Sequence, residues 1–209
     1  MDLKVKSLVV GQLASNCYLV YNKSDLLIID PGDDAEYIKD VIGDIDIKPS
    51  AILATHGHFD HIMAANELQL AYNIPFIIHK SDEFLVKRMS NTAKHFIGEI
   101  NALEPKISAY IDKTIELKKE KWFEVIETPG HTPGSVCFYN KINNFLIAGD
   151  LIFEAGGVGR TDYQYGDSDI LMRSIKDILK LPEATIVYSG HGGVFTIADF
   201  KNSLYNSNY

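Results

Sequence analysis

The sequence contains few cysteines and no long apolar run. Cys17 and Cys137 are the only cysteines among its 209 residues. Two cysteines make no disulfide framework, so we expect a reduced, cytoplasmic setting, with Cys17 as a small buried hydrophobic residue rather than a reactive thiol. No apolar stretch reaches the roughly 18 residues of a membrane span, and residues 1–6 do not resemble the start of an export signal. We therefore expect no membrane partner.

Basic residues are scarce as well. The chain has 20 Lys and Arg against 28 Asp and Glu, which gives a formal net charge of -8. A nucleic-acid-binding surface normally needs clustered Lys and Arg, so this balance argues against a nucleic-acid partner. A small anionic substrate stays compatible with the charge, because bound metal ions would add positive charge of their own.

The sequence also lacks repeats, low-complexity segments and linkers. A hydrophobic content of 46% and a charged content of 23% are ordinary for a globular protein, and the length suits one sizeable core. We therefore predict a single domain over residues 1–209.

The apolar pattern predicts a mixture of strands and helices. Runs rich in Val, Leu, Ile and Tyr predict strands at residues 5–10, 16–21, 26–30, 51–54, 74–79, 114–117, 122–128, 135–139, 145–148 and 185–188. Apolar residues at helical spacing predict helices at residues 33–42, 62–72 and 168–179, one more after Ser81 as N-cap, and a last helix from residue 197. Residues 90–112 show no clean period, so we expect a connection across the surface there. The pattern alone supports no more than a mixed α and β fold.

Four groups able to bind a metal lie close together directly after a short apolar strand: His56, His58, Asp60 and His61. In an extended backbone the side chains at i and i+2 point the same way, so His56 and His58 can bind one cation together. Asp60 and His61 follow the turn that Gly57 permits and can face a second cation. Imidazole and carboxylate groups are normal ligands of zinc and related metals. The alternative is a solvated loop that happens to be rich in histidine.

Three further motifs follow predicted strands and place a candidate ligand in a turn. They are Gly130-His131-Thr132-Pro133-Gly134, Ala148-Gly149-Asp150 and Ser189-Gly190-His191-Gly192. An earlier turn, Asp30-Pro31-Gly32, ends one of the first strands. Taken singly, each motif is typical of an ordinary turn or cap. His79 and His95 belong to no motif, and we interpret them as surface or core histidines.

In this order the motifs resemble those of the metallo-β-lactamase superfamily, whose signature His-x-His-x-Asp-His matches residues 56–61. The resemblance spans residues 30–192 and implies an α+β fold, a four-layer αββα sandwich. It also implies two divalent metal ions held by seven side chains: His56, His58 and His131 on one metal, Asp60, His61 and His191 on the other, and Asp150 bridging both. We expect zinc, with iron or manganese as alternatives, because all three suit these ligands.

The resemblance implies a reaction too. A hydroxide bridging the metals is expected to act as the nucleophile, because metal binding lowers the pKa of water to about 7. Asp60 and Asp150 would then be the catalytic carboxylates, while Asp30 and Thr55 would hold the metal loop from behind.

The position occupied by cysteine in antibiotic-degrading relatives is Asp150 here, which favours the short, single-domain glyoxalase II-like branch. Such enzymes hydrolyse thioesters such as hydroxyacylglutathione, so the expected partner is a small-molecule thioester. Because the sequence ends soon after His191, we expect no C-terminal helical domain of the kind that supplies much of the glutathione site in larger members. Arg160 and Tyr163 are candidate substrate-binding residues, although Arg160 can instead pair with Asp162.

Three other functions remain open. Persulfide dioxygenases share the fold, carry a run similar to Gly159-Arg160-Thr161-Asp162, and use a single iron at the positions of His56, His131 and Asp150. Against this, residues 189–192 follow the hydrolase form of the last motif. A lactone or other ester hydrolase is a further alternative, and a metal-binding domain without catalysis is the last.

Overall fold

The computed structural model of the protein describes residues 2–98, 102–118 and 120–206. Contacts between residues divide the chain into two compact units, one of residues 1–111 and one of residues 112–209. Each unit has its own sheet and its own helices. The single domain expected from the sequence stays a prediction.

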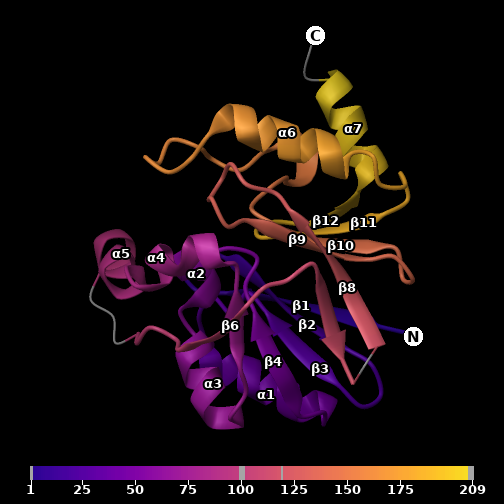
Figure 1. The fold of residues 1–209 in the computed structure, drawn as a ribbon. Helices are drawn as coiled ribbons and strands as arrows, with labels where there is room; N and C mark the ends of the chain where they lie inside the picture. The colour runs from indigo at the N-terminus through magenta and orange to yellow at the C-terminus, as the bar shows by residue number, and fades with distance from the viewer. Residues whose placement is uncertain (1, 99–101, 119, 207–209) are drawn as a thin grey trace. The chain divides into compact units, whose positions relative to one another are not determined.

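The first unit is built on a mixed sheet with the spatial order β1-β2-β3-β4-β5-β6 (Figure 1). Its strands are β1 (Lys4–Val10), β2 (Ser15–Tyr21), β3 (Leu26–Ile29), β4 (Pro49–Leu53), β5 (Phe76–Ile78) and β6 (Ile107–Tyr110). The first two pairings are antiparallel, and the pairings from β3 to β6 are parallel. The carboxyl ends of β3, β4 and β5 therefore reach the same edge of the sheet.

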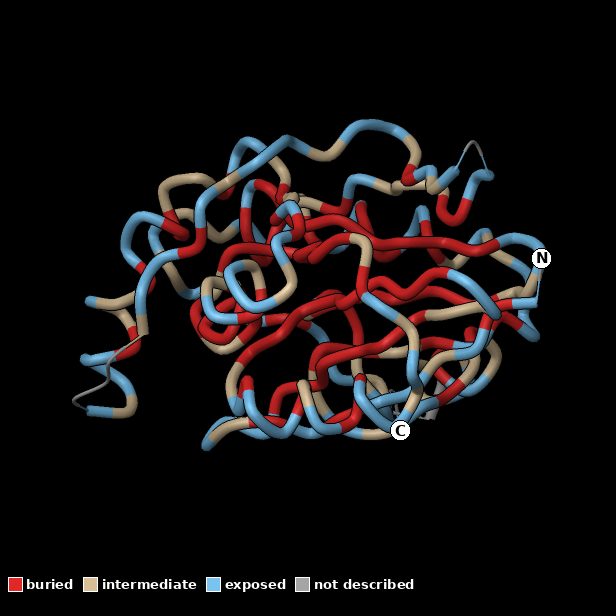
Figure 2. Tube along the Cα trace, turned by 90° about the horizontal axis from the view of Figure 1, so that it is seen from below, coloured by how far each residue is buried: buried red, intermediate tan, exposed pale blue. Residues whose placement is uncertain are grey.

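The helices of the first unit are α1 (Ala35–Ile45), α2 (Phe59–Ile62), α3 (Ala65–Tyr72), α4 (Glu83–Val86) and α5 (Met89–Ile97), with a 3-10 turn, η1 (Lys80–Asp82), before α4. In α1, Ile38 and Ile42 recur one turn apart and are buried, so the helix forms with an apolar face on the sheet. The helices and one face of the sheet share one core. Figure 2 shows the buried positions running along the strands, with exposed positions on turns and on outer helix faces.

The second unit is built on a sheet with the order β12-β11-β10-β9-β8-β7. Its strands are β7 (Thr114–Leu117), β8 (Glu120–Glu127), β9 (Val136–Asn140), β10 (Phe145–Gly149), β11 (Ile186–Ser189) and β12 (Val194–Thr196). Only β10 and β11 pair in parallel among the described strands of this sheet. Because β8 and β10 both run antiparallel to β9, the carboxyl ends of β8, β10 and β11 lie at one edge.

The helices of the second unit are α6 (Ser168–Ile178) and α7 (Ile197–Asn206), with a 3-10 turn, η2 (Glu154–Gly156). The α6 helix begins at Asp167, whose Oδ1 accepts the Ile170 N–H at 2.9 Å. Leu171 and Ile175 of α6 and Phe200 of α7 enter a core with the buried side chains of β9, β10 and β11. Both helices therefore pack on one face of this sheet (Figure 1).

Residues 90–112 differ from the expected surface connection. In the described part of this range, the structure has most of α5 and the strand β6, while residues 99–101 lie outside the described residues. Met89 and Ala93 are buried one turn apart in α5, but polar residues of low helix propensity separate them, which obscured the period. The strand β6 forms by pairing with β5, a contact that a local pattern does not predict.

Two predicted helix details were wrong. The helix expected at residues 62–72 is divided into α2 and α3, where the Ala64 N–H donates to the carbonyl oxygen of Pro31 at 3.0 Å. Ser81 is not the N-cap of the next helix but lies within η1, and the Nδ1 of His79 accepts its N–H at 3.3 Å. In both cases a partner outside the helix decided where the helix begins.

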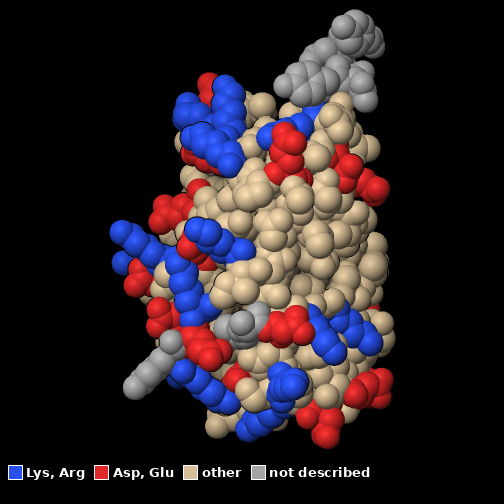
Figure 3. Space-filling view, turned by 90° about the vertical axis from the view of Figure 1, so that its right-hand side faces the viewer, with Lys and Arg blue, Asp and Glu red and all other residues tan. Residues whose placement is uncertain are grey.

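Acidic and basic side chains are mixed on the face that Figure 3 shows, around a broad area without charged groups. Neither sign of charge is gathered into one patch there.

Among the described residues, none of the helices has both the length and the hydropathy to cross a bilayer.

Candidate metal centre

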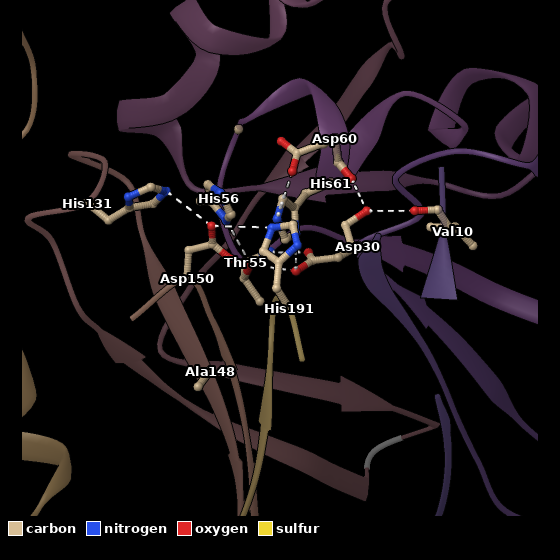
Figure 4. A network of polar contacts seen from close by, with 12 residues as sticks. Val10, Asp30, Thr55, His56, Asp60, His61, His131, Ala148, Asp150 and His191 are labelled. Carbon is tan, nitrogen blue, oxygen red and sulfur yellow. Dashed lines mark hydrogen bonds and ion pairs between the residues drawn. The ribbon is translucent and has the colours of Figure 1, made fainter. Parts of the chain in front are cut away.

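The motif at residues 56–61 lies at the carboxyl end of β4 in the first unit (Figure 4). His56 is buried, and so is His61 within α2. The ring centroids of His56 and His58 are 4.8 Å apart, and those of His56 and His61 are 4.3 Å apart. Three imidazoles of the predicted ligand set thus converge in this unit.

Asp30 holds this loop from the end of the neighbouring strand β3. Its φ of 52° lies in the left-handed region, which Asp tolerates better than most residues, and its side chain is fully buried. One carboxylate oxygen accepts the Thr55 N–H at 2.7 Å. The other accepts the Thr55 hydroxyl at 2.6 Å and the His61 Nδ1–H at 3.2 Å. Because both oxygens are engaged, Asp30 suits support of the loop, although ligand atoms of Asp30, His56 and His61 lie within 4.8 Å of one another.

The hydrogen bonds around Thr55 determine which nitrogen of His56 carries the proton. Thr55 donates its one hydroxyl hydrogen to Asp30, so its oxygen accepts from the His56 Nδ1, 3.1 Å away. The Nδ1 of His61 also donates, because a carboxylate only accepts. Both rings therefore present Nε2 with the lone pair that a metal ion requires.

The backbone of Asp60, in α2, is held by Ser15 of β2 and by the turn at residues 30–32. The Ser15 hydroxyl donates to the Asp60 carbonyl oxygen at 2.6 Å. A Cβ at Gly32 would lie 1.8 Å from that same oxygen, so the Asp-Pro-Gly turn requires glycine for close approach. The Asp60 Oδ2 lies 3.6 Å from the Nε2 of His61. The carboxylate is thus placed beside the imidazoles by contacts to its own main chain.

A second buried carboxylate at this loop, Asp82, belongs to none of the predicted motifs. Its Oδ2 accepts the Gly57 N–H at 2.8 Å. Gly57 was expected to permit a turn, but its φ is not positive; a Cβ there would instead lie 2.8 Å from the Cβ of Leu85. Asp82 comes soon after β5, as Asp30 comes directly after β3, and this placement after a parallel strand was the available signal.

In the second unit, Asp150 and His191 follow the parallel strands β10 and β11, so both emerge at the same edge of the sheet. The Asp150 Oδ2 lies 3.7 Å from the Nε2 of His191 and 3.6 Å from the Nε2 of His131 (Figure 4). One carboxylate oxygen is therefore placed near two imidazole nitrogens, an arrangement suited to metal binding.

His131 lies in the turn between β8 and β9. Its Nδ1 donates to the Arg160 carbonyl oxygen at 2.7 Å, because a carbonyl only accepts, and this leaves Nε2 available as the metal-binding atom. Gly130 has a φ of 134°, and a Cβ there would lie 2.3 Å from the Leu171 nitrogen. The turn therefore needs glycine at this position to pack against the start of α6.

The candidate substrate-binding residues, Arg160 and Tyr163, stack on each other. The Arg160 guanidinium lies 4.5 Å from the ring centre of Tyr163, which stacks on Tyr165 with centroids 5.3 Å apart. Arg160 also donates hydrogen bonds of 2.7 and 2.6 Å to Asp162, and these bonds lower the pKa of the Asp162 carboxyl to about 2. The pairing with Asp162 is thus present, while substrate binding stays a prediction.

The remaining histidines and the cysteines have structural contacts. His79 accepts a hydrogen bond from Ser81 at the start of η1, and the His95 ring lies edge-on to Phe96. Cys17 is buried, as expected. Burial raises the pKa of its thiol, with the charge of Asp30 adding to the effect, and burial raises the pKa of Cys137 to about 12.

The donor chemistry of each unit fits divalent metals. His56, His61 and His131 each have Nδ1 engaged by an oxygen, which orients Nε2 for coordination. Asp60 and Asp150 add carboxylate oxygens beside the imidazoles. Such a mixture of nitrogen and oxygen donors is accepted by zinc, iron and manganese alike.

Comparisons with known proteins agree with this chemistry. The family model described as metallo-beta-lactamase superfamily matches residues 10–191. A relative named hydroxyacylglutathione hydrolase GloC, from Haemophilus influenzae, is 32% identical over 207 residues, which cover 96% of this chain and 96% of the relative.

Two solved structures are also similar over nearly the whole chain, each with a TM-score of 0.88. The crystal structure of BLEG-1 B3 metallo-beta-lactamase is 34% identical and covers 95% of this chain and 97% of its own. The crystal structure of TTHA1623 in a di-iron-bound form is 32% identical and covers 95% of this chain and 98% of its own. The fold class predicted from the motifs is thereby confirmed.

Proposed function

Because the chain belongs to the metallo-beta-lactamase superfamily, we propose that it is a metal-dependent hydrolase of thioesters such as hydroxyacylglutathione. The relative named hydroxyacylglutathione hydrolase GloC supports this substrate class. The observation that carries the proposal is the fixed protonation of His56, His61 and His131, whose Nδ1 atoms donate to oxygens and whose Nε2 atoms are set to coordinate metal.

The predicted ligands keep their assignment as part of this proposal. His56, His58 and His131 would hold one metal, Asp60, His61 and His191 the other, and Asp150 both. Divalent metals bound there would supply a hydroxide near neutral pH, because they lower the pKa of water to about 7. Asp30 and Thr55 keep the imidazoles in the required orientation and protonation state.

A thioester suits the proposed site because its leaving group needs no strong general acid. The thiol released has a pKa of about 8.5, so it departs as a thiolate without a strong general acid. A glutathione-like thiol also carries carboxylates, which a guanidinium binds well. Asp162 takes two of the five N–H donors of Arg160, and the Tyr163 ring beneath the guanidinium offers a flat apolar surface.

A persulfide dioxygenase is the second candidate. The run Gly159-Arg160-Thr161-Asp162 and the residues after it, Tyr163 and Gln164, favour it. His56, His131 and Asp150 would then hold a single iron, as a set of two histidines and one carboxylate does in non-haem oxygenases. A solved relative is described in a di-iron-bound form, so iron belongs in any test of metal identity.

Metal content and a substrate panel test the proposal together. Protein purified without added metal would be analysed for zinc, iron and manganese, then assayed with hydroxyacylglutathione, a lactone, a β-lactam and a persulfide. We expect two metals per chain, with the highest kcat/KM for the thioester. One iron per chain with persulfide-dependent oxygen uptake would establish the dioxygenase instead. A higher kcat/KM for the lactone or the β-lactam would keep the hydrolase class and overturn the thioester assignment.

A further inference from the structure

We propose that Asp82 is a positioning residue for the metal loop, acting on His56 and His58 through the backbone N–H of Gly57. This role of Asp82 rests on the proposed function only because it requires that His56 and His58 bind a metal. No motif of the sequence pointed to Asp82, which lies beyond β5 and 25 residues from Gly57.

The carboxylate of Asp82 is directed at the loop rather than at its own helix. It is fully buried, and its Oδ2 accepts the Gly57 N–H at 2.8 Å. Asp82 occupies the N-cap position of α4, yet its side chain makes no capping hydrogen bond there. A buried carboxylate at a helix start would ordinarily accept from that helix. The observed bond to Gly57 therefore indicates a role in the neighbouring loop.

The two residues that flank His56 are each held by a buried carboxylate. The Thr55 N–H donates to Asp30 at 2.7 Å, and the Gly57 N–H donates to Asp82 at 2.8 Å. Asp30 and Asp82 come from the strand ends on either side of β4. The main chain of His56 is thus fixed from both sides, whereas the Asp30 contacts alone would fix only one.

Gly57 is the position at which this restraint is needed. It separates His56 from His58, whose ring centroids lie 4.8 Å apart, and the φ and ψ of Gly57 decide how these two side chains are placed relative to each other. Glycine has more conformational freedom than any other residue, so an unrestrained Gly57 would let the two imidazoles separate. The bond to Asp82 removes that freedom before any metal arrives.

Packing around Gly57 points to the same contact. A Cβ there would lie 2.8 Å from the Leu85 Cβ and 3.0 Å from the Asp82 carbonyl oxygen, so the segment from η1 to α4 rests directly on this glycine. Because the φ of Gly57 is not positive, close approach rather than backbone conformation requires glycine. The absence of a side chain at Gly57 thus lets Asp82 come close enough to accept the Gly57 N–H.

Binding of Co²⁺ alone to metal-free protein tests the proposal without any substrate. Residues that orient metal ligands typically change metal affinity by 10–100-fold when removed. We expect Asp82→Ala to lower the affinity for the first Co²⁺ by about that factor and to change its visible absorption spectrum. Asp82→Asn should stay near wild type, because the amide oxygen can accept the same N–H.

Asp25→Ala is the matched control, because Asp25 is a buried carboxylate of the same unit at the opposite end of β3. Its Co²⁺ affinity and spectrum should equal those of the wild type, even if its melting temperature falls. Wild-type affinity and spectrum in a folded Asp82→Ala would overturn the proposal, and so would an Asp82→Asn as weak as Asp82→Ala.

A second variant covers the case in which Asp82→Ala does not fold. Gly57→Ala pushes the same segment away without removing a carboxylate, and we expect a similar loss of Co²⁺ affinity. Unchanged affinity in Gly57→Ala would also overturn the proposal. Failure of the thioesterase assignment would appear differently, as wild-type protein that binds metal tightly but does not turn over thioesters.

Discussion

The Nδ1 of His131 donates a hydrogen bond of 2.7 Å to the backbone carbonyl oxygen of Arg160. The candidate metal ligand is therefore oriented by the main chain of the candidate substrate-binding residue. The guanidinium of Arg160 contacts Asp162 and the Tyr163 ring instead. Because orientation and charge come from different parts of one residue, a side-chain substitution can separate substrate binding from metal binding.

Arg160→Met removes the charge and keeps an unbranched side chain. We expect unchanged metal content and a KM for the anionic thioester that rises roughly 10- to 100-fold, because a hydrogen bond to a charged group contributes about 1.5–3 kcal/mol. The kcat should change little, as when uniform binding is lost. Arg173→Met, at an exposed position of α6, is the control. A loss of metal in Arg160→Met would contradict this division of roles.

Asp60→Ala and Asp150→Ala should each abolish turnover while the protein stays folded. Both are proposed metal ligands, and their side chains are partly exposed, so neither substitution opens a cavity in the apolar core. Circular dichroism and thermal unfolding would establish folding, and steady-state assays the loss of turnover. Asp169→Ala, in the first turn of α6, should keep full activity. Full activity in both ligand variants would exclude the dimetal mechanism.

Thr55→Val removes the hydroxyl between Asp30 and His56 at nearly constant volume. We expect metal affinity to fall by about 10–100-fold, because the His56 Nδ1 loses the oxygen that fixes its proton. Stability should fall by about 1–3 kcal/mol, since the buried carboxylate loses a donor. Thr55→Ser keeps the hydroxyl and serves as the control. Competition with a chromophoric chelator measures the affinities, and equal values for the two variants would refute the role of the hydroxyl.

Gly159→Ala should destabilise the protein and lower its activity. A Cβ at Gly159 would lie 2.0 Å from the Asp150 carbonyl oxygen, so the backbone that carries this proposed ligand must move, at a cost of about 1–3 kcal/mol. Gly43→Ala, in α1, is the opposite case: no described atom lies within 4 Å of the added Cβ. There we expect a gain of about 0.5–1 kcal/mol from helix propensity. Urea unfolding measures the free energy of unfolding of both variants, which should be below that of the wild type for Gly159→Ala and above it for Gly43→Ala.

The two cysteines should resist a thiol reagent in the native protein near neutral pH and react in denaturant. Burial raises the pKa of both thiols, to about 12 for Cys137, and the thiolate is the reactive form. Rapid modification of the native protein would contradict this.

The raised thiol pKa values also predict a pH dependence of stability. In the unfolded chain each thiol ionises at about pH 8.5. The stability from the buried neutral thiols is therefore complete below that pH and is lost as the pH rises toward the pKa of about 12 of Cys137. Urea unfolding above about pH 8.5 should show a smaller loss of stability in a Cys17→Ala/Cys137→Ala variant than in the wild type. Equal losses would refute the linkage.

Much of the candidate site could be predicted from the sequence because its chemistry is local. His56, His58, Asp60 and His61 are close neighbours in the chain, and a short loop followed by a short helix brings the rings of the three histidines together. The later candidate ligands each follow a strand whose apolar pattern is clear. The strands that deliver Asp150 and His191 were therefore recognisable before their pairing was known.

What the sequence by itself determined is the set of candidate metal ligands and the strands that deliver them. Only the tertiary structure decided how they are held. Asp82 reaches Gly57 across 25 residues, because β4 and β5 are neighbouring parallel strands whose ends share an edge. A glycine that permits a turn and a glycine that permits close approach look alike in a sequence. They differ only once the opposing segment is in place, because the steric limit at Gly57 comes from Leu85 and Asp82 rather than from its own backbone.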